Sequence, residues 1–289
     1  MTLSIAHLGP PGTYAEQAAV VYANWLKQST GIEATLCAYP SIAQSLQAVA
    51  QGQTQLAVVP VENSIEGSVT MTMDALWVLD SLRIQLALIL PITHTLISCA
   101  TSLDDIKTVY SHPQALAQCQ GWLEQFLPTV QLIPSNSTTE ALKLLKEDMT
   151  SAAIASMRAA ELYNLPTLAT GINDRPENCT RFWVISQGET DNSYQTSLTS
   201  PTHTSLAFSL PANLPGALVK PLQIFAQLDI NLSRIESRPT KRSLGEYLFF
   251  MDLEADADTP KMQSALAQLN TYTEILKIFG SYNILPIAI

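Results

Sequence analysis

The sequence predicts an α/β protein with a larger first domain of mostly parallel sheet and a smaller, ferredoxin-like second domain. Three observations support this prediction. Short apolar runs alternate with longer stretches of helical periodicity through about the first 190 residues. A polar stretch rich in Ser and Thr, residues 188–204, has no periodicity and the composition of a linker. Beyond it the elements follow in the order β-α-β-β-α-β.

The first domain is predicted element by element from these patterns. Short apolar runs predict strands at residues 3–8, 34–38, 55–61, 84–90, 108–110 and 152–155. Apolar residues at three- and four-residue steps predict helices at residues 15–27, 42–50, 72–79, 115–126 and 139–146. Ser41 can cap the second of these helices, because its hydroxyl can accept a hydrogen bond from a backbone N–H of the first turn.

The second domain follows the polar stretch. Strands are predicted at residues 205–210, 231–237, 247–253 and 273–279, and helices at residues 215–227 and 261–269. The predicted boundaries are therefore a catalytic domain at 1–190, a linker at 191–203 and a regulatory domain at 204–289. Such a small domain leaves a sheet face or edge uncovered, so we expect a homodimer or homotetramer.

Composition and charge exclude several classes of function. The chain has 289 residues, 47% of them hydrophobic and 14% charged, which is typical of a folded protein with a real core. Its net charge of −10 argues against nucleic-acid and membrane partners, which attract basic surfaces. The four cysteines lack metal-ligand spacing, and no signal peptide or membrane-length apolar run is present. We therefore expect reduced thiols, no metal and a cytoplasmic location.

Two polar motifs directly follow predicted strands of the first domain. The glycine-rich turn at residues 9–16 contains Gly12 and Thr13 and leads into a helix, where backbone N–H groups can bind a carboxylate or phosphate. The alternative is a tight strand-to-helix turn capped by Thr13. The motif at residues 60–69 supplies Asn63 and Ser64 at the carboxyl end of a strand, where α/β sheets bind ligands. A plain polar turn is equally compatible with it.

Two further motifs lie later in the first domain. In residues 110–119, His112 is either a general base or a residue that orders the turn. Residues 178–185 enter a strand, so that Cys179 and Arg181 leave it on the side opposite Thr180. A nucleophilic role for Cys179 is disfavoured because no base is adjacent in the sequence.

Taken in order, these motifs resemble the prephenate dehydratase family: Gly-Pro-x-Gly-Thr-Tyr, Pro-x-Glu-Asn-Ser, Ser-His-Pro-Gln-Ala-Leu-x-Gln-Cys and Asn-x-Thr-Arg-Phe. Residues 216–218 and 236–239 resemble the regulatory ACT domain of the same family. The resemblance covers essentially the whole chain. It implies two α/β lobes around a cleft, as in periplasmic binding proteins, followed by an ACT domain. The first motif begins nine residues from Met1, so no preceding chorismate mutase domain is expected.

The resemblance also implies an activity, without metal or cofactor: a carbon–oxygen lyase that decarboxylates and dehydrates prephenate to phenylpyruvate in phenylalanine biosynthesis, regulated by L-phenylalanine. The family's active-site positions match Thr180, Asn63, Ser111 and Gln118. Substrate-binding positions are expected at Gly12, Thr13, Glu62, Ser64, Arg181 and Phe182. The phenylalanine-binding motifs match Gly216, Ala217, Leu218, Glu236, Ser237, Arg238 and Pro239.

Prephenate is a dianion, whereas the chain is acidic, so local donors must hold the substrate. We expect backbone N–H groups at residues 12–13 and beside Asn63 to anchor it, with Arg181 or Arg175 as helpers. Arg181 has the rival role of a salt bridge to a loop carboxylate. The expected role of Thr180 is to donate a hydrogen bond to the leaving oxygen.

Three other functions are compatible with the sequence. The nearest is an arogenate dehydratase, whose substrate carries an amino group where prephenate has a keto group. A non-catalytic solute-binding protein shares the two-lobed fold, but it would be favoured by a secretion signal. An amino-acid-sensing regulator without activity is the third.

Overall fold

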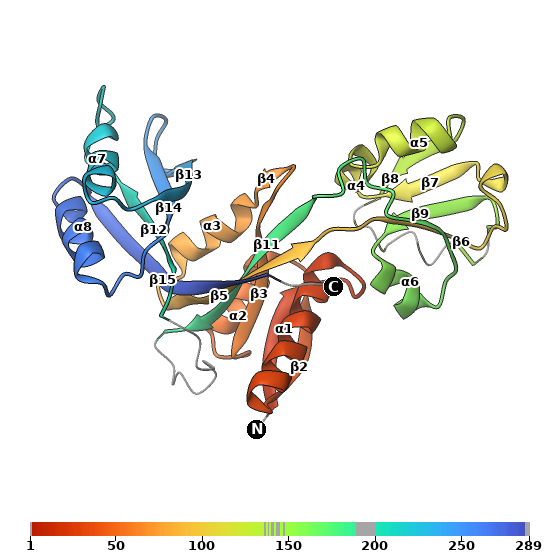
Figure 1. Cartoon of the computed structure of the whole chain (residues 1–289), viewed down its shortest axis with the longest axis horizontal. Coiled ribbons are helices and arrows are strands. Elements are labelled where there is room, and N and C mark those ends of the chain that lie inside the picture. The colour runs from red at the N-terminus through yellow and green to blue at the C-terminus, as the bar shows by residue number, and fades with distance from the viewer. Residues whose placement is uncertain are drawn as a thin grey trace.

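The computed structural model describes residues 2–135, 137, 139, 142, 145–146, 148–188 and 200–286. Figure 1 shows three parts: a first lobe at the centre, a second lobe on one side and a C-terminal domain on the other. Among the described residues, no helix is both long and apolar enough to cross a membrane.

The first lobe begins with alternating strands and helices. Its elements are β1 (Thr2–Leu8), α1 (Tyr14–Thr30), β2 (Glu33–Tyr39), α2 (Ile42–Ala50), β3 (Leu56–Asn63), β4 (Gly67–Ser68) and α3 (Thr70–Val78). The Thr13 hydroxyl caps α1 by accepting a hydrogen bond from Glu16 N, and the Ser41 hydroxyl caps α2 by accepting one from Gln44 N. The cap at Ser41 confirms the prediction made from the sequence. Strand β1 pairs in parallel with β2 and β3.

Two strands join the first lobe to the second. Strand β5 (Leu82–Pro91) leads out and β11 (Cys179–Gln187) leads back, so the two pair antiparallel, and β11 also pairs antiparallel with β3. The prediction of mostly parallel sheets was therefore wrong. The reason is topological, because a chain that leaves a lobe and returns through the same sheet must run in opposite directions.

The second lobe has a five-stranded sheet in the order β10-β6-β9-β7-β8. Its elements are β6 (Thr95–Ser98), β7 (Thr108–Ser111), α4 (Pro113–Ala117), α5 (Gln120–Phe126), β8 (Gln131–Pro134), β9 (Ser151–Ala155), α6 (Met157–Tyr163) and β10 (Thr167–Thr170), with a 3₁₀ turn at Leu103–Asp105. The single helix predicted at 115–126 is interrupted at Gln118–Cys119, where Asp174 accepts hydrogen bonds from the first N–H groups of α5. The helix predicted at 139–146 lies largely outside the described residues.

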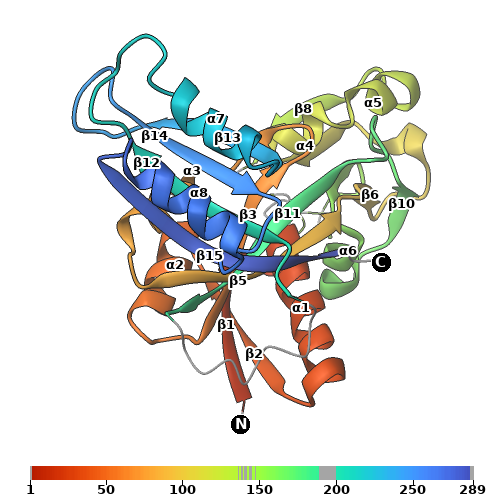
Figure 2. The same ribbon diagram turned by 60° about the vertical axis from the view of Figure 1, so that its left-hand side comes forward.

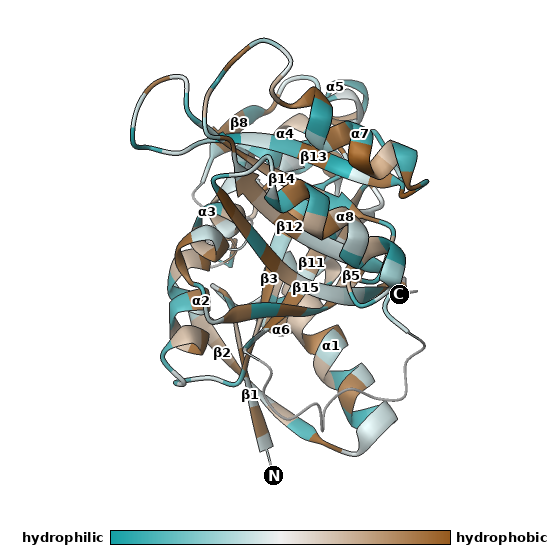
Figure 3. Ribbon diagram, turned by 90° about the vertical axis from the view of Figure 1, so that its left-hand side faces the viewer, coloured by the Kyte–Doolittle hydropathy of each residue, from teal (hydrophilic) through white to brown (hydrophobic). Residues whose placement is uncertain are grey.

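The C-terminal domain has the predicted β-α-β-β-α-β order. Its elements are β12 (His203–Ser209), α7 (Val219–Gln227), β13 (Leu232–Pro239), β14 (Tyr247–Leu253), α8 (Pro260–Asn270) and β15 (Ile275–Pro286). Helix α7 starts later than predicted, because Gly216 has a φ of +80° and forms a turn rather than helix. Helices α7 and α8 cover the sheet face turned away from the first lobe (Figure 2), and both carry apolar and polar sides (Figure 3).

Strand β15 joins the C-terminal domain to the first lobe. It pairs antiparallel with β12 through Tyr282 and then parallel with β5 from Asn283 onward. The result is one ten-stranded sheet with the order β13-β14-β12-β15-β5-β11-β3-β1-β2, with β4 beside β3. Gly280 lies at the junction, where a Cβ would come within 2.6 Å of the Ile84 carbonyl oxygen, so the two backbones approach as closely as glycine allows.

Candidate active site

A cleft of about 870 Å³ lies between the two lobes. Helices α1 and α3 begin at the cleft, and the ends of β3 and β11 lie beside it. The described lining residues include one carboxylate, Glu66, and no lysine or arginine. Five residues predicted from the motifs line the cleft: Thr13, Asn63, Gln118, Thr180 and Phe182. Among the described residues, no group of three or more His, Cys, Asp or Glu side chains gathers as it would around a metal ion.

Thr180 and Asn63 face each other across two neighbouring strands. They are paired in the β11–β3 ladder, and Asn63 Nδ2 donates to Thr180 Oγ1 over 2.9 Å. Thr180 is 8% exposed, so its hydroxyl is largely shielded from bulk water yet reaches the cleft. Because Oγ1 accepts from Asn63, its own hydrogen is available to donate to a ligand in the cleft.

The orientation of the Asn63 amide follows from its partners. Oδ1 accepts hydrogen bonds from the backbone N–H groups of Ile65 and Glu66, over 3.0 and 3.1 Å. Nδ2 donates to Asn178 Oδ1 at 2.8 Å as well as to Thr180. A flipped amide would place two donors against two backbone N–H groups, so the network sets which atom faces Thr180.

A second chain of hydrogen bonds continues from Asn178. Its Nδ2 donates to Gln118 Oε1 over 2.9 Å, and His94 Nε2 lies 2.9 Å from the same oxygen. His94 Nδ1 is 2.8 Å from the Tyr14 hydroxyl. Burial lowers the pKa of His94, against a smaller opposing effect of its hydrogen bond to Gln118. The lowered pKa favours the neutral ring at pH 7, and because the Gln118 oxygen can only accept, the single ring proton lies on Nε2.

The start of α1 offers backbone donors to the cleft. The Thr13 hydroxyl accepts from Glu16 N, and Gly12 N donates to Glu16 Oε2 over 2.7 Å, so the Gly12 N–H expected to bind substrate is already used. Tyr14 and Ala15 occupy the first two helical positions, and both line the cleft. Their N–H groups have no intrahelical acceptor and lie at the positive end of the helix dipole.

Contacts beside the cleft hold the lobes together. Arg158 of the second lobe pairs with Glu16 through two hydrogen bonds of 2.9 and 3.1 Å. Burial by itself raises the pKa of the Glu16 carboxyl, but the hydrogen bonds from Arg158 and from Gly12 N–H outweigh it and leave that pKa below its ordinary value. The Ser156 hydroxyl also donates to the Gly12 carbonyl oxygen over 2.8 Å.

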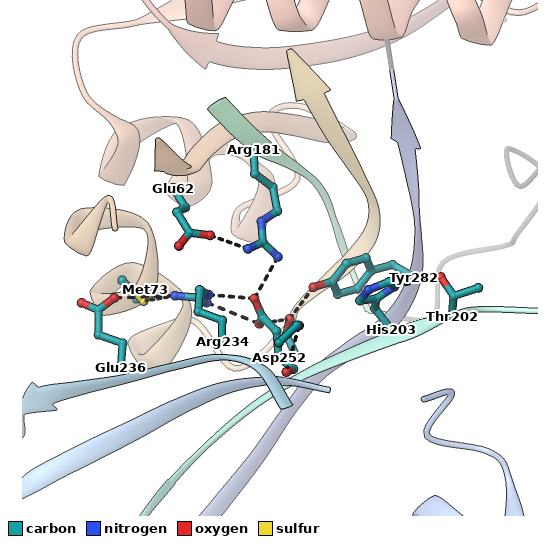
Figure 4. Close-up of polar contacts among 11 residues, drawn as sticks. Glu62, Met73, Arg181, Thr202, His203, Arg234, Glu236, Asp252 and Tyr282 are labelled. Atoms are coloured by element: carbon teal, nitrogen blue, oxygen red, sulfur yellow. Dashed lines mark hydrogen bonds and ion pairs between the residues drawn. The ribbon is translucent and has the colours of Figure 1, made fainter. Parts of the chain in front are cut away.

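Several residues expected at the site lie elsewhere. Ser111 is fully buried and donates to the Ile154 carbonyl oxygen, while the Ser64 hydroxyl accepts from Cys179 N. Arg181 pairs with Glu62 and with Asp252 on the far side of the sheet (Figure 4). This is a salt-bridge role, but the carboxylates lie on strands β3 and β14 and not in a loop as expected. None of these side chains lines the cleft.

Arg175, which was expected as a helper, and His112, which was considered as a general base or as a residue that orders the turn, have local roles. Arg175 is exposed, and its Nη1 lies 3.9 Å from Glu177 Oε1. His112 lines the cleft, and its Nδ1 accepts from Gln114 N at the start of α4, so it orders the turn.

The expected phenylalanine-binding residues lie on the C-terminal domain. Gly216, Ala217 and Leu218 form the turn before α7. Glu236, Ser237, Arg238 and Pro239 end strand β13, and Arg238 pairs with Asp74 of α3.

Sequence reasoning missed three residues of the cleft network. Asn178 stands inside a recognised motif but was given no role. His94 and Tyr14 lie 80 residues apart and meet only in the fold. The position of His94 just after the buried strand β5 was the available signal, since polar residues at strand ends often face ligands.

Comparisons with known proteins agree with this architecture. The prephenate dehydratase family matches residues 5–190, and the ACT domain matches residues 204–271. The fold and cleft thus define a two-lobed catalytic domain joined to an ACT domain.

The similarity extends over whole relatives. A prephenate dehydratase of Lactococcus lactis subsp. cremoris is 35% identical over 98% of both chains. A bifunctional chorismate mutase/prephenate dehydratase of Aquifex aeolicus is 38% identical over 97% of this chain and 73% of its own. The crystal structure of prephenate dehydratase from Arthrobacter aurescens in complex with L-Phe is 34% identical, covers 97% of this chain and 90% of that chain, and has a TM-score of 0.84. The chain belongs to the prephenate dehydratase family.

Proposed function

We propose that this chain converts prephenate to phenylpyruvate in the cleft between its lobes. The observation that carries the proposal is the Thr180 hydroxyl, held by Asn63 and left with a free hydrogen beside the cleft, in a member of this family. The reaction breaks the bond between the ring and its carboxylate, which leaves as carbon dioxide. The released electron pair makes the ring aromatic as the bond to the hydroxyl breaks, and one proton converts that leaving oxygen to water.

The barrier lies in the departure of hydroxide, a poor leaving group. Thr180 has too high a pKa to give up its proton freely, so its role is to donate a hydrogen bond as negative charge develops on the leaving oxygen. The bond from Asn63 Nδ2 holds Oγ1 and polarises the hydroxyl, which strengthens its donation. Gln118 lies in the cleft, where its Oε1 is bonded to both Asn178 and His94, and it is proposed to orient the substrate.

The substrate's side-chain carboxylate is proposed to bind the N–H groups of Tyr14 and Ala15. A helix N-terminus favours an anion without a cationic side chain, which suits a cleft whose described lining has no lysine or arginine. Phe182 and Ile92 provide an apolar wall near the ring. Such surroundings favour loss of the ring carboxylate, because that group sheds its charge as carbon dioxide.

The test is an absorbance assay for phenylpyruvate with the purified chain and prephenate, repeated with arogenate. The proposal expects turnover with prephenate and a higher kcat/KM for it than for arogenate. A reversed preference would instead favour the arogenate dehydratase alternative. No turnover with either substrate would contradict the proposal.

Regulation by L-phenylalanine is part of the proposal. The supporting observations are the ACT domain match and the L-Phe complex of the Arthrobacter aurescens relative. Residues 216–218 and 236–239 are the proposed effector site, and exposed apolar side chains near them, Leu214 and Val219, are proposed to pack in a homodimer or homotetramer. Calorimetric titration with phenylalanine tests the site. Absence of any binding heat, under conditions where the chain is oligomeric, would contradict it.

Two further features complete the proposal. Residues 1–190 form the catalytic unit, 191–203 the linker and 204–289 the regulatory unit, which fits the family matches at 5–190 and 204–271. A cytoplasmic location fits the four free cysteines.

A further inference from the structure

The strands that carry Thr180 and Asn63 also carry an ion pair on their opposite face. In the antiparallel ladder Thr180 is paired with Asn63, and the next pair is Arg181 with Glu62. Because successive side chains alternate between sheet faces, one pair faces the cleft and the other faces the C-terminal domain. Arg181 Nη2 donates to Glu62 Oε2 across the two strands. The two pairs therefore share one stretch of backbone.

The ladder is irregular immediately beyond these two pairs. Arg181 is opposite Glu62, but Phe182 is opposite Pro60, so Val61 is an extra residue on β3. A β-bulge of this kind separates the last two pairs from the regular part of the ladder and redirects nearby side chains. Beyond the bulge these end residues are held by β4 beside β3, by β5 beside β11 and by their own side-chain contacts across the two strands.

Asp252 of the C-terminal domain holds Arg181 from the other side. Its side chain is fully buried, and Oδ2 accepts from Arg181 Nη1 over 3.1 Å. The same carboxylate accepts from Arg234 Nε at 2.7 Å and from the Ser205 hydroxyl at 2.6 Å. Figure 4 shows Arg181 reaching toward Asp252 and Glu62, with Arg234 beside them. A buried carboxylate with this many partners is held in one place.

We propose that Arg181, anchored by Asp252, is a positioning residue that keeps Asn63 opposite Thr180 by holding Glu62 across the strands. The inference rests on the proposed function, in which Thr180 donates to the leaving oxygen. It gives the C-terminal domain a direct contact with the catalytic strands. It also replaces the substrate-binding role expected of Arg181, whose guanidinium is bonded to two carboxylates and does not line the cleft.

The first test is the Arg181→Met variant of the full chain, with Arg181→Lys for comparison. Methionine keeps much of the apolar stem and removes the charge. A misplacement of the catalytic pair by on the order of 1 Å lowers kcat by about 10- to 100-fold, with KM for prephenate changed by no more than about twofold. Arg181→Lys restores part of kcat, because it keeps one charged donor. A large rise in KM with unchanged kcat would make Arg181 a binding residue and overturn the proposal.

A double-mutant cycle with Thr180→Val separates positioning from general weakening. If Arg181 acts through Thr180, adding Arg181→Met to Thr180→Val lowers kcat little further, whereas independent effects multiply. Full multiplication of the two losses would overturn the proposal. The matched control is Lys277→Met, because Lys277 also ties the C-terminal domain to the first lobe, through Trp77 O and Asp80, but touches neither β3 nor β11. Its kcat should stay at the wild-type value. An equal loss in this control would also overturn the proposal.

Glu62→Gln provides the same test if Arg181→Met does not fold. The Glu62 side chain is 31% exposed, so the neutral amide is tolerated there, and the tie to Arg181 is weakened. It should lower kcat, by less than Arg181→Met because the amide oxygen still accepts from Arg181. Combined with Thr180→Val it should lower kcat little further, and full multiplication of the two losses would again overturn the proposal. Failure of the proposed function itself is distinguishable, because wild type would then form no phenylpyruvate, or Thr180→Val alone would turn over normally.

Discussion

Replacing Thr180 with valine removes one hydroxyl and keeps the shape of the side chain. The loss of a single donor to a developing negative charge costs about 10²–10³-fold in kcat, or about 2.7–4 kcal/mol of transition-state stabilisation. Folding should be affected much less. Asn63 Nδ2 keeps Asn178 Oδ1 at 2.8 Å and the Cys179 carbonyl oxygen at 3.2 Å as acceptors, so no buried donor is left without a partner. The expected loss of stability is below about 1.5 kcal/mol.

The assay is phenylpyruvate formation under saturating prephenate, with urea unfolding of the same preparations. Thr180→Ser is the matched control, since it retains the hydroxyl and should keep kcat within about tenfold of wild type, in contrast to the loss of about 10²–10³-fold in valine. KM should change little in either variant, because the hydroxyl acts mainly as the leaving oxygen gains charge. If Thr180→Val turned over within about threefold of wild type, the hydroxyl would not be the donor that the reasoning requires.

Three further predictions concern the cleft and its surroundings. Gly12 and Gly31 both have a left-handed φ, but only at Gly12 would a Cβ meet the second lobe, 3.1 Å from Thr139 Cγ2. The control Gly31→Ala should cost about 1–2 kcal/mol of unfolding free energy, and Gly12→Ala should cost more. Equal losses in urea unfolding would contradict this. Because the pKa of Glu16 is lowered in the folded chain, its contribution to stability is present above pH 4.5 and is lost as the pH falls through the pKa of the folded state. The unfolding free energy of Glu16→Gln should therefore decrease less in acid than that of wild type. Because the pKa of His94 is lowered in the folded chain, the unfolding free energy should rise with pH up to about 6.5. His94→Gln should make this rise shallower. An unchanged dependence of unfolding free energy on pH would show that the ring is not held neutral in the fold.

The family and the places of its motifs could be predicted because both depend on local sequence. The capping residue Ser41 and the period-two separation of Thr180 from Arg181 were also predictable, since each follows from a few neighbouring positions. The hydrogen-bond chain from Tyr14 through His94 to Gln118 was not predictable. Its members come from three distant segments, and only the closure of the two lobes brings them together.

The amino-acid sequence by itself determined the α/β class and the β-α-β-β-α-β pattern of the C-terminal domain, because hydrophobic periodicity and turn residues act over short distances. Tertiary structure alone decided three other features: the antiparallel return of β11, the addition of β15 to β5, and the burial of Asp252 against Arg181. Each depends on which distant strands become neighbours, and that choice is made by packing the whole chain rather than by any local pattern.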